Sequence, residues 1–224
     1  KISFKVKKSN NSNNSKKTIS GYFLQKSHKL LEDFLPNNKK SDSILEVGAG
    51  TGHHYAYINR KPLKYILSDS SDDMLEIATK KYQNEINSGL IEVDKQNATK
   101  LTYADNSFDR LIATHVLEHI LNPVDALEEW NRVVKPGGII SISLPCDPGM
   151  MWRLGRYFGP RTQLQKQGVN YDYLQAAEHV NSIFNLVVFI RHHFNVVVED
   201  WYPLKAPVAD LNLFYTCHIK VEKE

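Results

Sequence analysis

A glycine-rich stretch directly after a short apolar run has the residue types of a ligand-binding loop. The run Ile44–Val47 is rich in β-branched residues and is typical of a buried strand. Gly48, Gly50 and Gly52 follow it at alternate positions. Glycine lets the chain turn sharply and lets a ligand approach bare backbone. A helix beginning after Gly52 would also aim its N–H groups and the positive end of its dipole at that ligand.

The spacing of the glycines argues against a dinucleotide as the ligand. A dinucleotide loop has the pattern G-x-G-x-x-G, whereas here His53 occupies the position of the third glycine. Glu46 lies two residues before the first glycine and suits a ligand with an ammonium or sulfonium charge better than a pyrophosphate. A glycine-rich turn without a ligand is the alternative, because one such motif alone is weak evidence.

A carboxylate follows the next predicted strand, Leu63–Leu67. Asp69 lies at the carboxyl end of that strand. Ligands of open parallel sheets bind outside the carboxyl ends of the strands, where a carboxylate can accept hydrogen bonds from both hydroxyls of a ribose. Asp69 or Ser70 could instead cap the following helix, since Ser70 and Asp73 fit a capping box. The two interpretations are compatible.

Strand and helix patterns alternate along most of the chain. This alternation predicts right-handed crossovers and a mainly parallel sheet. The predicted strands are 44–47, 63–67, 90–93, 108–113, 139–144, 194–199 and 211–221. The predicted helices are 22–35, about 70–85, 122–134 and about 179–192. A tight turn is predicted over 135–138, and a loop is predicted to hold Trp201, Tyr202 and Pro203.

The alternation breaks after Pro145, where residues 146–178 are rich in aromatic and basic side chains. We interpret this segment as an insertion after the carboxyl end of a strand, placed to cover the ligand site. Its arginines could bind a phosphate or carboxylate, and its aromatic rings could stack on a sugar or another ring. A lid whose rings are buried and whose arginines face water is the alternative. The candidate acceptor-binding residues are Trp152, Arg153, Arg156, Tyr171 and Tyr173, with Arg161 as a further anion-binding candidate.

The size and composition predict one domain over residues 21–224, preceded by a basic polar arm over 1–20. Hydrophobic residues make up 42% of the 224, enough for a sizeable core. The net charge of +3, from 28 basic and 25 acidic residues, is too balanced to indicate nucleic-acid binding. Cys146 and Cys217 indicate neither a disulfide framework nor a zinc site, and with no secretory signal or membrane-length apolar run they favour a cytoplasmic location.

Five segments together resemble the class I S-adenosylmethionine-dependent methyltransferases, in particular the branch that methylates small molecules, such as the quinone C-methyltransferases. The segments are Leu45–Gly52, Asp69–Leu75, Asp105–Asp109, His115–His119 and Arg132–Gly138. The resemblance implies a doubly wound, Rossmann-like α/β fold. Its seven-stranded sheet would be mostly parallel with an antiparallel last strand, and residues 146–178 would form a helical lid insertion.

The resemblance also implies S-adenosyl-L-methionine as the cofactor. Glu46 would help to hold its amino group, the glycine loop would wrap its methionine and ribose, and Asp69 would bind the ribose hydroxyls. Family members usually carry Asp-Ala where this chain has Asn97-Ala98, so the contact with the adenine amino group lacks a charge. The implied cofactor-binding residues are Glu46, Gly48, Ala49, Gly50, Gly52, Asp69, Ser70, Met74, Asn97, Ala98 and Thr114.

The predicted activity is methyl transfer to a small-molecule acceptor, with a sugar- or nucleotide-linked hydroxyl favoured. An acceptor that loses a proton needs a nearby base. His115, at the end of the fourth strand, is the first candidate and His179 the second, with a structural role as the alternative for each. Glu178 and Asp147 are the candidate partners of these histidines. His119 is expected one turn away from the site. No metal is expected, because no cluster of carboxylates has the spacing of an oxygen-rich site.

Other functions fit the same pattern less well. An RNA or other macromolecule methyltransferase would share this core. Pro145-Cys146 resembles the proline-cysteine pair of RNA cytosine methylases, but it follows the fifth strand rather than the fourth, so we take Cys146 as structural. A non-catalytic S-adenosylmethionine-binding subunit is the alternative outside enzymes, and the unbroken glycine loop and Asp69 argue against it. The sequence does not indicate an oligomeric state, and nucleic acid is not an expected partner.

Overall fold

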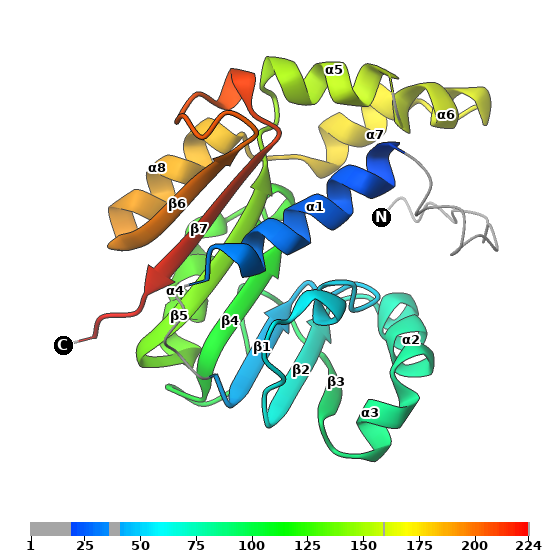
Figure 1. The fold of residues 1–224 in the computed structure, drawn as a ribbon. Coiled ribbons are helices and arrows are strands. Elements are labelled where there is room, and N and C mark those ends of the chain that lie inside the picture. The colour runs from blue at the N-terminus through cyan, green and yellow to red at the C-terminus, as the bar shows by residue number, and fades with distance from the viewer. Residues whose placement is uncertain (1–18, 36–40, 159, 224) are drawn as a thin grey trace.

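Seven strands form one sheet in the computed structural model, which describes residues 19–35, 41–158 and 160–223 (Figure 1). The predicted basic arm therefore lies outside the described residues, except for its last two positions, which begin the first helix. The strands are β1 (Ser43–Val47), β2 (Lys64–Asp69), β3 (Ile91–Lys95), β4 (Phe108–Thr114), β5 (Val134–Pro145), β6 (Val196–Tyr202) and β7 (Phe214–Lys220).

Helices cover both faces of the sheet and its upper edge (Figure 1). They are α1 (Ile19–Asp33), α2 (Asp72–Lys81), α3 (Gln83–Asn87), α4 (Pro123–Val133), α5 (Met150–Phe158), α6 (Pro160–Lys166), α7 (Tyr171–Glu178) and α8 (Ile183–His193). Short 3-10 helices occupy His54–Tyr57, Leu117–His119 and Ala209–Leu211. Across the described ranges, we find no helix with the length and apolar character needed to cross a bilayer.

The strand order is β3-β2-β1-β4-β5-β7-β6. β7 runs antiparallel to both β5 and β6, and the remaining pairs are parallel. This confirms the predicted doubly wound sheet with an antiparallel last strand. The order reverses between β1 and β4, and ligands of such sheets bind in the crevice outside the carboxyl ends of the strands at that point.

An apolar core joins one face of the sheet to α4 and α8. Leu127 and Trp130 of α4 are fully buried, as are Leu186 and Ile190 of α8 to within 1%. They pack with strand residues such as Leu111 in one continuous cluster. The helical spacing of these apolar positions is what places α4 and α8 against the sheet.

The opposite face carries α1 and a buried polar network. Arg110 of β4 is 1% exposed, and its Nη2 lies 2.8 Å from Oε1 of Glu32 in α1. His54 Nε2 donates to the same carboxylate oxygen at 3.1 Å, and Arg110 Nε donates to Ser141 Oγ in β5 at 2.9 Å. Burial raises the pKa of Glu32, but His54 and Arg110 outweigh it and hold that pKa at about 2. The pair is therefore ionised and fixes α1 across the sheet.

Two expectations about the first half of the chain are wrong. After Gly52 the chain forms only a 3-10 helix of four residues, because His54 points inward to Glu32 and the chain then leaves for β2. Ser71, not Ser70, caps α2 and accepts from Met74 N at 3.5 Å. The reason is that Asp69 Oδ1 accepts the Ser71 N–H at 2.8 Å and so sets where the turn ends.

Three expectations about the second half also change. Val134 pairs with Phe108 and Ile139 with Arg110, so the predicted turn over 135–138 is a bulge within β5. β6 continues through Trp201 and Tyr202, which were expected in a loop, because Tyr202 still pairs with Phe214 of β7. α8 begins at Ile183, where Ser182 caps it, rather than near residue 179.

A buried carboxyl in β1 makes the stability of this fold depend on pH. Glu46 is 1% exposed and accepts a hydrogen bond of 2.7 Å from the Tyr65 hydroxyl of β2. Burial raises its pKa from 4.5 to about 8. Folding therefore favours the protonated form of the Glu46 carboxyl. The stability that this protonated carboxyl contributes is lost as the pH rises from about 4.5 to about 8.

We therefore expect Glu46→Gln to remove part of the pH dependence of stability. Between pH 5.5 and 8, the free energy of unfolding of the parent chain should fall by about 3 kcal/mol relative to that of the variant. Urea denaturation at the two pH values measures the difference, and the exposed Glu128→Gln in α4 is the control. Parallel pH profiles for the parent and Glu46→Gln would show that Glu46 is ionised in the folded protein.

Candidate functional site

A cleft of about 340 Å³ opens at the reversal of strand order, outside the carboxyl ends of β1, β2 and β4. We call it the switch-point cleft. Six of the residues that line it are Gly48, Asp69, Ser70, Asn97, Ala98 and His115. All six were predicted site residues, and they come from four separate segments of the chain. None of the described residues that line the cleft is Lys or Arg, so it lacks the side chains that a pyrophosphate would attract.

Asp69 shapes the loop that borders this cleft. Its Oδ2 accepts the Gly50 N–H at 2.8 Å, which holds the β1 loop against the end of β2. Gly50 has φ +54, and a Cβ added there would meet no heavy atom within 4 Å. A Cβ on Gly48, at φ +62, would instead lie 2.6 Å from Val116 Cγ2. The loop thus packs tightly on the end of β4 at Gly48 and leaves open space at Gly50.

Several predicted cofactor residues lie outside the lining of the cleft. Glu46 is buried in β1 against Tyr65, and Thr114 is 8% exposed at the end of β4. Met74 is 42% exposed on α2. Ala49 is buried in a core cluster, and Gly52 packs on the Tyr82 ring. Their contacts with a cofactor stay predictions.

Asn97 lies in the cleft but its side chain is engaged locally. Its Oδ1 accepts from Thr99 N at 3.1 Å and from Thr99 Oγ1 at 3.0 Å. This turn fixes the segment after β3 and leaves the Nδ2 group for a ligand. Gln96, which the sequence did not single out, also lines the cleft and donates to Asp94 Oδ2 at 2.7 Å.

A second cavity, of about 290 Å³, lies beneath the helices of the insertion. We call it the lid cavity. Its apolar and aromatic lining comes from α1, α5 and β7 and includes Phe23, Leu24, Trp152 and Phe214. Its polar lining consists of three histidines, one glutamate and one arginine, together with the Tyr171 hydroxyl: His115, Glu118, His119, His179 and Arg156.

His115 and His119 line both the switch-point cleft and the lid cavity. The two spaces therefore meet at these side chains. The expectation that His119 lies one turn from the site is wrong, because His119 lines both spaces and its Nδ1 is held by Glu178 O at 2.9 Å. Sequence reasoning could have found it, since His115, Glu118 and His119 have i, i+3, i+4 spacing and so share one face of a helical turn.

The tautomer of His115 follows from its neighbours. The Ser27 hydroxyl donates to Leu24 O at 2.8 Å, so its oxygen accepts from His115 Nε2 at 3.0 Å. The Nδ1 atom of His115 is then without a proton, and it lies 3.7 Å from Glu118 Oε1. His115 has φ +58, a conformation that is rare outside glycine and costs energy to hold.

His179 enters the lid cavity from the segment between α7 and α8. Its Nδ1 lies 2.7 Å from Asp147 Oδ2, as the pairing with Asp147 predicted. Burial raises the pKa of Asp147, but His179 and then Arg156 outweigh it and hold that pKa below its ordinary value. Asp147 is therefore ionised and acts as an acceptor toward both side chains. Glu178, the other candidate partner, is exposed and offers only its backbone oxygen, to His119.

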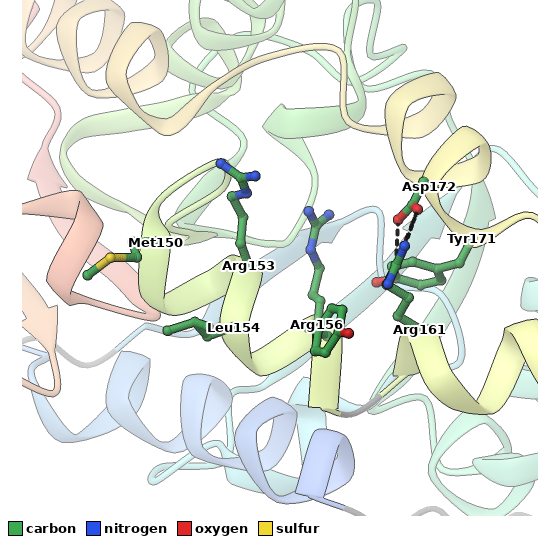
Figure 2. Close-up of a pocket in the computed structure, with 8 residues that line it drawn as sticks. Met150, Arg153, Leu154, Arg156, Arg161, Tyr171 and Asp172 are labelled. Carbon is green, nitrogen blue, oxygen red and sulfur yellow. Dashed lines mark hydrogen bonds and ion pairs between the residues drawn. The ribbon is translucent and has the colours of Figure 1, made fainter.

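A third cavity, of about 640 Å³, lies among α5, α6 and α7 (Figure 2). We call it the arginine cavity. Figure 2 shows Arg153 and Arg156 extending from α5 to the same side, while Arg161 makes a two-pronged pair with Asp172. Arg156 and Tyr171 line both this cavity and the lid cavity. Tyr173 is 56% exposed and lines neither cavity, so the structure does not bring it to the site.

Cys146 has no part in this site. Its thiol is fully buried, and burial raises its pKa to about 12. A protonated thiol is a poor nucleophile. The structural role predicted for Cys146 agrees with this environment. Cys217 is likewise a buried free thiol.

The region around the cleft matches a known family. Residues 45–142 match the family model described as a methyltransferase domain. Residues 45–142 are therefore similar to this family, and the sheet around them has the fold of the class I S-adenosylmethionine-dependent methyltransferases. The resemblance of the five sequence segments is thereby confirmed.

Curated relatives of this methyltransferase domain include the ubiquinone/menaquinone biosynthesis C-methyltransferase UbiE of Francisella tularensis subsp. novicida. It is 33% identical over 116 residues, which cover 49% of this chain and 46% of that protein. The chain thus spans about half the length of the curated relatives that it matches.

Solved structures resemble most of the chain. A SAM-dependent methyltransferase from Aquifex aeolicus has a TM-score of 0.60 at 20% identity, covering 87% of this chain and 89% of that one. The N-methyltransferase NodS from Bradyrhizobium japonicum, solved with S-adenosyl-L-homocysteine, has a TM-score of 0.63 at 12% identity, covering 89% and 87%. At these identities the likeness establishes the fold.

The switch-point cleft fits S-adenosylmethionine, the cofactor of this family. The open space at Gly50 admits a ligand close to backbone. Each oxygen of Asp69 accepts one backbone N–H and keeps a lone pair for a ribose hydroxyl. The absence of Lys and Arg from the described lining favours a ligand with a sulfonium charge over one with phosphates.

We expect Asp69→Ala to weaken binding of S-adenosylhomocysteine by about 10- to 100-fold, because it removes a charged acceptor for the ribose hydroxyls. Isothermal titration calorimetry measures the loss. Asp73→Ala, an exposed carboxylate in the first turn of the neighbouring α2, is the matched control and should bind like the parent chain. Unchanged affinity in a folded Asp69→Ala would contradict the ribose contact.

Proposed function

We propose that this chain binds S-adenosylmethionine in the switch-point cleft and methylates a small molecule held in the lid cavity. The observation that carries the proposal is that His115 and His119 line both spaces, so a group in one faces a group in the other. Bound cofactor supplies a methyl group activated by a sulfonium sulfur. The contribution of the chain is to align the acceptor with that methyl group and to exclude water from it.

The lining of the lid cavity supports a ring-bearing acceptor. Phe23, Trp152 and Phe214 supply aromatic rings to its lining, whereas His115 and His119 lie at the inner end, where the cavity meets the cleft. A volume of about 290 Å³ suits a small molecule, which favours this reading over RNA methylation. The inner histidines would face the polar group of that molecule, so we favour a hydroxyl as the methylated group.

A sugar- or nucleotide-linked hydroxyl is the more specific form of this proposal. Such an acceptor would extend from the lid cavity into the arginine cavity, since Arg156 and Tyr171 belong to both. Arg153 points into the arginine cavity beside Arg156 and would pair with an acceptor phosphate (Figure 2). Arg161 contributes less, because Asp172 already pairs with it.

His115 is the proposed catalytic base. Ser27 holds its Nε2 proton, which leaves Nδ1 as the atom that accepts the hydroxyl proton of the acceptor. The Glu118 carboxylate, 3.7 Å from Nδ1, would stabilise the imidazolium that forms. His179 lines the lid cavity but not the switch-point cleft, so it is the more distant of the two predicted bases.

Turnover with a panel of phenols, sugars and nucleotide sugars, followed by release of S-adenosylhomocysteine, tests this function. We expect His115→Gln to lower kcat by about 10²- to 10⁴-fold, the usual contribution of a general base, and to leave cofactor affinity within a factor of about 3. His192→Gln, in the exposed last turn of α8, is the control.

Two results would contradict the proposal in different ways. Tight binding of S-adenosylhomocysteine without turnover of any acceptor would favour the non-catalytic binding subunit. Turnover by His115→Gln at the parent rate would leave the methyltransferase activity standing and exclude His115 as the base.

A further inference from the structure

The lid cavity gathers three metal-ligating side chains, and two of them, His119 and His179, have no required role in the proposed methyl transfer. Glu118, His119 and His179 each offer one ligand atom, and the three atoms all lie within 4.8 Å of one another. They come from two segments some sixty residues apart in sequence. We propose that these three side chains form a binding site for a divalent transition-metal ion such as Zn²⁺.

The neighbours of the two histidines leave one nitrogen of each ring free to bind an ion. His119 Nδ1 lies 2.9 Å from the backbone oxygen of Glu178, which can only accept, so this nitrogen carries the proton. His179 Nδ1 lies 2.7 Å from the Asp147 carboxylate oxygen Oδ2, so this nitrogen is the one placed to carry a proton. In each neutral ring the Nε2 atom is left as a lone-pair donor, and His119 Nε2 lies 3.8 Å from Glu118 Oε1.

Glu118 supplies an independent observation. Its side chain is 2% exposed, and its Oε2 atom is buried without a hydrogen-bond partner. A buried carboxylate without a donor is costly unless a positive charge lies beside it. The ring nitrogens nearest to Glu118 Oε1, in His115 and His119, lie at 3.7 and 3.8 Å, too far for hydrogen bonds. A cation among these acceptor atoms would satisfy all of them.

The backbone holds the two halves of the site together. Val180 N and Asn181 N both donate to Glu118 O, at 2.9 and 3.2 Å. The Asn181 side chain donates to Leu117 O at 3.3 Å and to Ile120 O at 2.5 Å. The segment that carries His179 is thereby fixed against the segment that carries Glu118 and His119. Ligands held in place before binding lose little entropy when an ion binds.

The ligand set selects the class of ion. Two imidazole nitrogens and one carboxylate suit Zn²⁺, Co²⁺ or Fe²⁺, whereas Mg²⁺ and Ca²⁺ prefer oxygen ligands throughout. Hydrogen bonding of the second ring nitrogen to a carboxylate or backbone oxygen is the usual support of metal-bound histidine. His119 Nδ1 has such a bond, to Glu178 O, and His179 Nδ1 lies 2.7 Å from the Asp147 carboxylate. Three protein ligands leave coordination positions open toward the lid cavity.

Such an ion would sit where the acceptor is proposed to bind, and this part of the inference rests on the proposed function. It would draw electron density from an acceptor hydroxyl and lower the pKa of that hydroxyl. The hydroxyl proton would then pass to His115, which borders the site at 3.7 Å from Glu118. Asp147 is a positioning residue in this arrangement, since it acts through His179.

The test is titration of Co²⁺ into the metal-free, untagged chain, followed by visible absorption, with Zn²⁺ competition and calorimetry. We expect one ion per chain. Glu118→Gln and His179→Gln should each weaken its binding by about 100-fold or more, and Asp147→Asn by about 10- to 100-fold. His192→Gln is the matched control and should bind Co²⁺ like the parent chain. Binding of S-adenosylhomocysteine is measured on every variant.

The outcomes separate this inference from the proposed function. A chain that binds S-adenosylhomocysteine but no stoichiometric Co²⁺ or Zn²⁺ would overturn the metal site, leaving protonated histidines as the partners of Glu118. Unchanged Co²⁺ affinity in His179→Gln would also overturn it, and this variant decides if Glu118→Gln does not fold. Loss of Co²⁺ binding in both variants supports the metal site, whether or not the parent chain binds S-adenosylhomocysteine.

Discussion

The ion pair between Arg110 and Glu32 is the interaction on which the rest of the structure depends. Arg110 lies in the middle of β4 and is 1% exposed, so its charge must be paired within the protein. Its partner comes from α1, and the pair therefore fixes where that helix crosses the sheet. α1 in turn carries Phe23 and Leu24 to the wall of the lid cavity and Ser27 to His115. A charge buried in the sheet thus helps to set the tautomer of the proposed base.

Contacts between distant segments also hold the other side of the site in place. The insertion of α5–α7 follows β5 at the carboxyl edge of the sheet. The residues that follow it, Val180 and Asn181, return the chain to the segment after β4 by donating to Glu118 O. The acceptor side and the cofactor side are therefore held by the same few residues. The reacting groups at this junction are therefore positioned by the fold rather than by a flexible loop.

The sequence predicted the alternation of strands and helices and a ligand site at the carboxyl ends of the first two strands, because strands, glycines and Asp69 carry strong local patterns. It failed where a contact across the fold decides the local structure. His54 turns inward to Glu32, which leaves a 3-10 helix where an α-helix was expected. His119 joins the site because its Nδ1 meets a backbone oxygen 59 residues away in sequence. The places of Ser27, Phe23 and Leu24 had no local signal at all, since they depend on the buried charge of Arg110.

A crystal structure of the chain with S-adenosylhomocysteine would test most directly the claim that cofactor and acceptor meet at His115. The account predicts that the ribose lies against Asp69, the adenine beside Asn97 and Ala98, and the sulfur on the side of the cleft that His115 and His119 share with the lid cavity. A ligand bound with its sulfur turned away from these histidines, or bound outside the switch-point cleft, would contradict it.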